Sequence, residues 1–303
     1  MTRKFKLESE NKFIAFVDIL GFSEMHDVME KKLDKYMEII RETCRNEKLQ
    51  FALFSDNALL YTTDNLTDEN FPDLLLKMVR ACSTILSKCI SNDIPIRGCI
   101  SCGKVVIRGM ENDILITGKP IIDAVTNEKI QNWVGIIISP KVIQGANWKY
   151  SVISNECLND TKFSLLEKFI HKIKNENPNF FNLIEYKIPT NDKRTFDGIA
   201  VIPDTFHTPI SNITLSNFKL DLESYADNIK YLLLNTSDPE IQLKYHNTLE
   251  FISRCTQNIW DLLFECMHIK NNGSSPDLGK RYSAVLAPVL LDEQIQTKTA
   301  QVQ

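Results

Sequence analysis

Apolar and polar residues follow two rhythms along the first two thirds of the chain. Short runs rich in β-branched and aromatic residues predict strands. Longer stretches with an apolar residue every three or four positions predict amphipathic helices. The predicted strands cover residues 12–22, 49–63 (a hairpin that turns at Ser55, Asp56 and Asn57), 94–109, 113–120, 134–143, 181–189 and 198–206. The predicted helices cover residues 23–47, 71–91, 120–132 and 163–174.

The order of these elements is strand, helix, hairpin, helix, two strands, helix, strand, helix and two strands. It predicts an α+β sandwich with a ferredoxin-like core, in which a mixed or mostly antiparallel sheet carries its helices on one face. The run at 134–143 is continuously apolar. We therefore expect it to be a central strand that is covered on both faces.

From about Phe218 onward the pattern is helical only. One helix is predicted to begin with Ser237 or Asp238 as its cap and Pro239 in its first turn. Its apolar stripe consists of Ile241, Tyr245, Leu249, Ile252, Ile259 and Leu262. These changes divide the chain into a main domain at 1–212, a helical extension at 213–270 and a polar tail at 271–303 that we expect to be flexible.

Composition narrows the functional classes. The chain has 303 residues, of which 43% are hydrophobic and 24% charged, and its net charge is −4. Such a balance is typical of a globular protein and gives no basic surface for duplex nucleic acid. No segment approaches the roughly 20 apolar residues of a membrane helix, and the polar N-terminus lacks the pattern of a secretion signal. With eight cysteines and no such signal, we expect a cytoplasmic protein with reduced thiols.

Two acids have apolar neighbours on both sides: Asp18 in "FIAFVDIL" and Asp56 in "FALFSDNALLY". If the first strand and the hairpin are adjacent, both carboxylates emerge at one edge of the sheet. Two convergent carboxylates favour Mg²⁺ or Mn²⁺, with water and triphosphate oxygens as further ligands. The backbone carbonyl of Ile19 could add a ligand, and Gly21 would let the chain approach phosphates closely. Taken singly, Asp56 could be only a turn residue and Asp18 a helix cap.

Four segments, in order, resemble the motifs of class III nucleotidyl cyclases. "FVDILGF" is similar to the first metal-binding strand, and "FSDNALLY" to the second metal-binding hairpin. "PIRGCISCGKVVI" is similar to the next strand, with Arg97, Gly98 and Gly103 in the expected places. "GKPIIDAVTNEK" resembles the Gly…Ala…Glu helix of the family at Gly118, Ala124 and Glu128, and "EYKIP" fits the end of the fold. The resemblance covers roughly residues 12 to 205, and ordered motifs are more specific than any single one.

Within that family the chain looks most like bacterial Pycsar pyrimidine cyclases, which make cyclic UMP or cyclic CMP in antiviral defence. The resemblance implies a homodimer with active sites at its interface and two Mn²⁺ or Mg²⁺ ions bridged by Asp18 and Asp56. The metals would bind the triphosphate of UTP or CTP and activate the ribose 3′-hydroxyl for attack on the α-phosphorus, which releases pyrophosphate. The substrate-binding positions that we expect are Gly21, Phe22, Ala52, Arg97 and Leu115.

Four positions depart from the purine cyclases of the family. Where these have a ribose-binding asparagine and a transition-state arginine, this chain has Ile122 and Thr126, and neither replaces the bidentate contact of an arginine. The two base-selecting positions hold Ala52 and Leu115. An ordinary adenylate or guanylate cyclase is therefore not expected. The chain either uses other cations, such as Arg97, Lys104, Arg108 or Lys119, or has lost activity.

Two further functions stay open: a catalytically degenerate protein that binds a nucleotide or a partner, and a metal-dependent nucleotidyltransferase with a linear product. Single residues also have simpler interpretations. Arg97 could form a surface ion pair, and Phe22 could belong to the core. The Cys99–Cys102 pair lacks the second pair that zinc needs, and in a strand the two side chains face opposite sides, so we expect packing cysteines.

Overall fold

The computed structural model describes residues 9–21, 29–110, 113–143, 182–204 and 215–272. Its strands are β1 (Ser9–Ile19), β2 (Leu49–Phe54), β3 (Asn57–Thr62), β4 (Ile96–Met110), β5 (Asp113–Gly118), β6 (Gly135–Ile138), β7 (Leu183–Pro189) and β8 (Thr195–Val201). Its helices are α1 (Met29–Glu47), α2 (Phe71–Ile90), α3 (Lys119–Ile130), α7 (Leu215–Leu234) and α8 (Pro239–Asn272). The predicted helix at 163–174, the tail at 273–303 and Phe22 lie outside the described residues.

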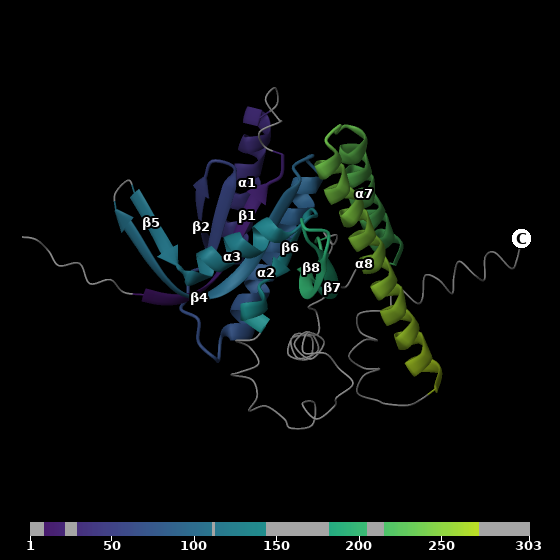
Figure 1. The fold of residues 1–303 in the computed structure, drawn as a ribbon. Helices are drawn as coiled ribbons and strands as arrows, with labels where there is room; N and C mark the ends of the chain where they lie inside the picture. The colour runs from purple at the N-terminus through teal and green to yellow at the C-terminus, as the bar shows by residue number, and fades with distance from the viewer. Residues whose placement is uncertain (1–8, 22–28, 111–112, 144–181, 205–214, 273–303) are drawn as a thin grey trace, which may run out of the picture.

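The strands form one eight-stranded sheet in the order β2-β3-β1-β4-β6-β8-β7, and β5 pairs with the far part of β4 (Figure 1). Only the β4–β6 pair is parallel among these strands, and the other pairs are antiparallel. The predicted mostly antiparallel α+β sheet is therefore confirmed. The predicted hairpin is β2–β3. The predicted central strand is β6, whose four residues are all buried between β4 and β8.

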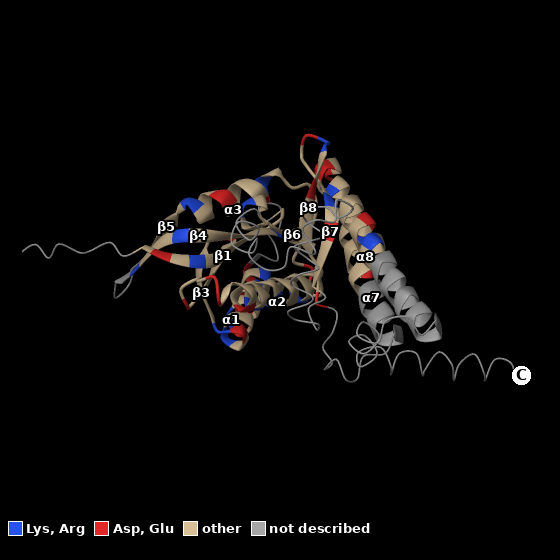
Figure 2. Ribbon diagram, turned by 90° about the horizontal axis from the view of Figure 1, so that it is seen from below, with Lys and Arg blue, Asp and Glu red and all other residues tan. Residues whose placement is uncertain are grey.

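Helices cover both faces of the sheet rather than one. Alternate residues of a strand point to opposite faces. In β1, Phe13 and Val17 belong to a core shared with α1 and α2, whereas Ile14 belongs to a second core shared with Ala124 of α3. Figure 2 shows α3 on one side of the strands and α1 and α2 on the other. The expectation that all helices share one face is therefore wrong for α3. The buried side of this helix is short and partly polar, so its sequence shows no strong apolar stripe that would indicate the face on which it packs.

The C-terminal helices pack against this domain. Helix α8 begins at Pro239, and the Oδ1 atom of Asp238 accepts a hydrogen bond of 2.7 Å from the Glu240 N–H. Asp238 is thus the predicted cap. Tyr245 and Ile252 are buried in the same core as α2. No helix in the described parts of the chain has the length and apolar character needed to cross a membrane. The domain limits drawn from the sequence stay a prediction.

Candidate functional site

Asp18 and Asp56 come together at the end of β1 because β1 pairs with the hairpin. Asp18 is the last residue but one of β1 and lies opposite Asn57 of β3 and Arg97 of β4. Asp56 is in the turn that precedes β3, where Ser55 adopts a positive φ of 57°. The Ile19 N–H donates to the Asp56 carbonyl at 3.3 Å, which ties the turn to the strand end. The sequence-predicted pair is therefore adjacent in space.

The Asp18 carboxylate is half-buried and lies near two other acids. Burial, followed by the charges of Glu128 and Asp56, raises its pKa from 3.8 to about 7, although Arg97 and Lys129 oppose this. It makes no hydrogen bond or ion pair to any residue that the structure describes. In contrast, Asp56 accepts a hydrogen bond of 3.0 Å from the Asn57 amide. A half-buried carboxylate without a donor is stabilised as an anion by a bound cation.

The donor set fits a hard divalent cation. Two carboxylates and the nearby Ile19 carbonyl are oxygen ligands of the kind that Mg²⁺ and Mn²⁺ prefer. Among the described residues no group of three or more His, Cys, Asp or Glu side chains is arranged to hold a metal. This protein site alone is therefore incomplete, and water or substrate oxygens would supply the remaining ligands. The ligand roles of Asp18, Ile19 and Asp56 stay predictions.

Beside Asp18, Arg97 is held in a buried polar network. Its Nε donates to Glu128 Oε1 at 2.5 Å, and its Nη1 donates to the Gln131 carbonyl at 2.7 Å. Gln131 is fixed in turn by bonds to the Gly98 carbonyl (3.0 Å) and from the Trp133 indole N–H (2.8 Å). Arg97 is only 9% exposed, so the alternative of a surface ion pair is wrong. Burial raises the pKa of Glu128, and the ion pair with Arg97 opposes that rise.

Glu128 therefore belongs to the site, although its sequence match carried no assigned role. It is 1% exposed on the last turn of α3, and its charge is the largest electrostatic contribution that raises the Asp18 pKa after burial. The signal was present in the sequence as a carboxylate on a predicted helix. The partner could not be predicted, because Arg97 lies 31 residues away in the chain.

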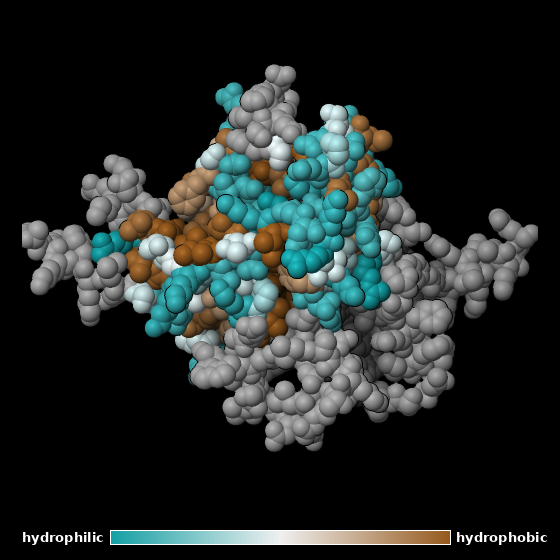
Figure 3. Space-filling view, in the orientation of Figure 1, coloured by the Kyte–Doolittle hydropathy of each residue, from teal (hydrophilic) through white to brown (hydrophobic). Residues whose placement is uncertain are grey.

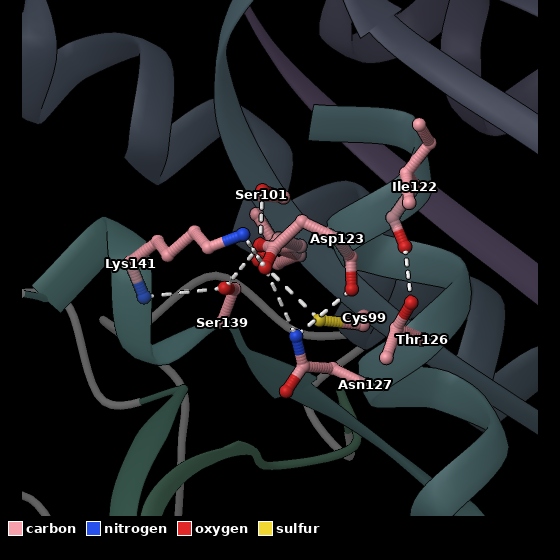
Figure 4. A network of polar contacts seen from close by, with 9 residues as sticks. Cys99, Ser101, Ile122, Asp123, Thr126, Asn127, Ser139 and Lys141 are labelled. Carbon is pink, nitrogen blue, oxygen red and sulfur yellow. Dashed lines mark hydrogen bonds and ion pairs between the residues drawn. The ribbon is translucent and has the colours of Figure 1, made fainter. Parts of the chain in front are cut away.

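A second network fixes α3 on the sheet. Asp123 accepts hydrogen bonds from Ser101 of β4 (2.7 Å) and from Ser139, and forms an ion pair with Lys141 (2.7 Å). Burial alone would raise the pKa of Asp123, but the bonds from Lys141, Ser139 and Ser101 outweigh it and hold that pKa below the usual value. Figure 4 shows Asp123 and Asn127 beside these serines. The network is structural: it positions the helix that carries Glu128.

On the same helix, Ile122 and Thr126 have no charged group to offer a ligand. Ile122 is 68% exposed. The Thr126 hydroxyl donates to the Ile122 carbonyl at 2.7 Å, a contact within its own helix (Figure 4). The positions at which an asparagine and an arginine would be expected therefore contribute no cation.

Two other expected substrate-binding residues lie near Asp18. Gly21 follows β1 and has a φ of 69°, a left-handed conformation that favours glycine. Ala52 of β2 is 8% exposed and lies opposite Leu59 of β3. Both side chains point to the face of the sheet that carries Asp18. Their roles stay predictions. The cysteines behave as expected: Cys99 packs in the core shared with α3, and Cys102 packs against the opposite core.

The remaining expected residues are not close to Asp18 within one chain. Lys104 is seven residues from Arg97 along β4, roughly 23 Å in an extended strand. Arg108 is eleven residues from Arg97, roughly 36 Å in an extended strand, and Leu115 lies opposite Arg108 on β5. Lys119 follows Gly118, which pairs with Val105 at the same far part of β4. Lys104, Arg108 and Lys119 could therefore serve an Asp18 site only in a second copy of the chain, and their roles stay predictions.

No protein-family model and no curated protein matches the chain. Solved structures that match include the guanylyl cyclase Cya2, with 14% identity and a TM-score of 0.40 over 47% of this chain and 81% of that one. They also include the catalytic core of a rhodopsin-guanylyl cyclase with converted specificity in complex with ATPalphaS (16%, 0.42, 67% and 100%) and the adenylyl cyclase CyaB from P. aeruginosa (12%, 0.41, 68% and 100%). At these scores and identities the similarity assigns neither a family nor an activity to this chain.

Proposed function

We propose that the chain is a metal-dependent nucleotide cyclase that converts UTP or CTP to the 3′,5′-cyclic nucleotide and pyrophosphate. The observation that carries the proposal is the meeting of Asp18 and Asp56 at one end of β1, with the Asp18 carboxylate lacking a donor among the described residues. When bound, two Mn²⁺ or Mg²⁺ ions would supply Lewis-acid stabilisation of the triphosphate and activation of the ribose hydroxyl. Asp18, Asp56 and the Ile19 carbonyl would hold them.

The chain's own residues would orient the nucleotide. Gly21 lets the backbone approach the phosphates without a Cβ. Ala52 leaves the site face of β2 without a polar side chain for the edge of the base, so the proposed preference for UTP or CTP rests on the sequence resemblance. Arg97, held by Glu128 and Gln131, would add a fixed charge that does not need to reorganise, although Glu128 offsets most of it. As in the cyclases that the sequence resembles, the product would be a second messenger in antiviral defence.

A homodimer is part of this proposal. Leu115 cannot reach Asp18 of its own chain, but a second copy could bring it there. Leu115 of β5 and Ile122 and Ile130 of α3 are 53%, 68% and 40% exposed, and Figure 3 shows apolar residues in the part of the surface formed by β5 and α3. Large apolar side chains that are exposed in one protomer favour contact with another protein surface. The measured mass in solution should therefore be twice 34.8 kDa.

The test uses the purified full chain with each of the four nucleoside triphosphates and Mn²⁺, and identifies products by mass spectrometry. Cyclic UMP or cyclic CMP is the expected product. A folded dimer that makes no cyclic product from any of the four would refute the proposal. A linear product would instead indicate a nucleotidyltransferase.

The second candidate is a catalytically degenerate nucleotide-binding protein. It is favoured by Ile122 and Thr126, which give α3 no group to stabilise a transition-state phosphate. Thermal stabilisation by a nucleotide without product would support it, whereas release of pyrophosphate would exclude it.

A further inference from the structure

Few cations lie near the candidate metal site. Arg97 is already engaged in other bonds, and position 126, where an arginine was expected, holds a threonine. Arg97 directs Nε and Nη1 to Glu128 and Gln131. Thr126 stands where an arginine was expected, and its hydroxyl bonds within its own helix. A triphosphate needs charge-assisted donors beyond the metal ions. Lys129 of α3 acts on Asp18 but is exposed, so another element near the end of β1 would supply further donors.

Helix α8 reaches that point. A Cβ built on Gly21, just after β1, would lie 3.6 Å from Ile241 Cδ1. The Asn247 amide donates to the Asn132 carbonyl at 2.6 Å, directly after α3. Two contacts one and a half turns apart thus fix both the position and the rotation of the first turns of α8. The helix spans from the loop after the metal-binding strand to the end of the helix that carries Glu128.

The rotation is fixed further by Thr248, which is fully buried. Its Oγ1 accepts the Val134 N–H at 2.8 Å and donates to the Lys244 carbonyl at 2.7 Å. Ile241, Lys244 and Thr248 are three and four residues apart, so they lie on one face of α8. That face is turned toward the body of the protein by the contacts of Ile241 and Thr248.

Lys244 is therefore a half-buried lysine at the edge of the acidic site. Its ammonium forms no hydrogen bond or ion pair with any residue in the described parts of the chain. Burial raises the pKa of Glu128, and among the cations that oppose this rise Lys244 contributes after Arg97 and Lys129. Lys129 is exposed on α3. A half-buried lysine that lies near Glu128 and has no bonded partner among the described residues is suited to an anion that arrives with its own metal.

We propose that Lys244 binds the polyphosphate of the nucleotide, so that α8 supplies in cis a cation that α3 lacks. The inference rests on the proposed function, because it concerns the same site. It gives the helical extension a part in substrate binding. The site of each protomer would then combine β1, the β2–β3 turn and α8.

The first experiment compares Lys244→Met with wild type in nucleotide turnover. The ammonium would contribute a charge-assisted hydrogen bond, so kcat/KM should fall about 10- to 100-fold, mainly through KM. Inhibition by pyrophosphate should weaken by a similar factor, and Lys244→Arg should restore much of both. Lys230→Met is the matched control, because Lys230 is an exposed lysine on α7 that pairs with Asp227. It should stay within twofold of wild type.

The second experiment needs no variant. Wild-type protein is acetylated with an amine-specific reagent, with and without pyrophosphate and Mn²⁺, and the modification of Lys244 is measured by mass spectrometry. Lys244 should be protected severalfold and Lys230 should not.

An active wild type whose Lys244→Met variant is folded and keeps its kcat/KM and pyrophosphate inhibition would overturn the inference but leave the cyclase proposal standing. Equal acetylation of Lys244 with and without pyrophosphate, at concentrations that inhibit fully, would also overturn it. If the Met variant does not fold, the acetylation result decides. A wild type without any product refutes the proposed function itself.

Discussion

Replacing Asp18 with asparagine should stabilise the metal-free protein while it abolishes activity. The folded state holds the Asp18 proton more tightly than the unfolded chain does, since burial and then Glu128 and Asp56 raise its pKa from 3.8 to about 7. Ionising Asp18 therefore destabilises the fold. The penalty is absent below about pH 4, grows as pH rises and is complete above about pH 7.

The size of this penalty follows from the pKa. A rise from 3.8 to about 7 corresponds to about 4 kcal/mol. The carboxylate is only half-buried, so screening by solvent leaves roughly 2 kcal/mol. In a chain of this size such a difference is equivalent to about 4–8 °C in Tm. Asp18→Asn removes the charge but keeps the shape of the side chain, so it should recover most of this stability.

The assay is thermal unfolding in a chelator at pH 5 and pH 8, followed by addition of Mn²⁺ at pH 8. In the chelator at pH 8 the variant should melt about 4–8 °C above wild type, and at pH 5 the gap should shrink by more than half. Mn²⁺ should raise the Tm of wild type and leave the variant nearly unchanged. Asp64→Asn is the matched control, because Asp64 is exposed. If Asp18→Asn melts below wild type at pH 8, or if the gap does not depend on pH, the acidic-cluster reasoning is wrong.

Three further predictions concern the same site and its supports. Asp56→Ala should abolish turnover yet change the free energy of unfolding by less than about 1 kcal/mol, as measured in urea, because it loses one neutral-donor hydrogen bond; retained turnover would remove Asp56 from the metal site. Glu128→Gln should destabilise the fold by about 3–5 kcal/mol in the same assay, since it leaves Arg97 buried without its counter-charge; a loss below 1 kcal/mol would mean that the pair is solvated. Thr248→Val should cost about 1–3 kcal/mol by leaving the Val134 N–H unpaired, and Thr248→Ser should cost much less; equal losses would assign the effect to packing.

Local patterns were sufficient for the elements whose signal lies within a few residues. The β2–β3 hairpin follows from two β-rich runs around a polar turn, and the start of α8 follows from Asp238 before Pro239. The adjacency of Asp18 and Asp56 was a conditional prediction that required β1 and β3 to be neighbours. That pairing is set by the whole sheet and not by either segment alone.

The contacts that define the chemistry of the site are nonlocal, and for that reason the sequence did not predict them. Arg97 is separated from Glu128 by 31 residues, and the two meet because α3 packs against β4, where Asp123 accepts a bond from Ser101. Likewise Asn132 and Asn247 are 115 residues apart. Nothing in the apolar stripe of α8 indicates that Lys244 would lie near Glu128, since a lysine next to a buried helix face is ordinarily solvated.

The charge arrangement of the site also determines how its ligands would bind. Arg97 is paired with Glu128, and neither Asp18 nor Asp56 forms an ion pair with a residue that the structure describes. These two carboxylates would repel a bare triphosphate. A bare divalent cation would have few protein ligands, since no group of three acids among the described residues is arranged to hold a metal. A metal–nucleotide complex satisfies both requirements, because its cation meets the carboxylates while its outer phosphate oxygens meet Lys244. We therefore expect positive coupling: Mn²⁺ should tighten nucleotide binding and nucleotide should tighten Mn²⁺ binding by the same factor. In a titration of Lys244→Met that coupling should persist, because it arises at the acids, while the overall nucleotide affinity falls.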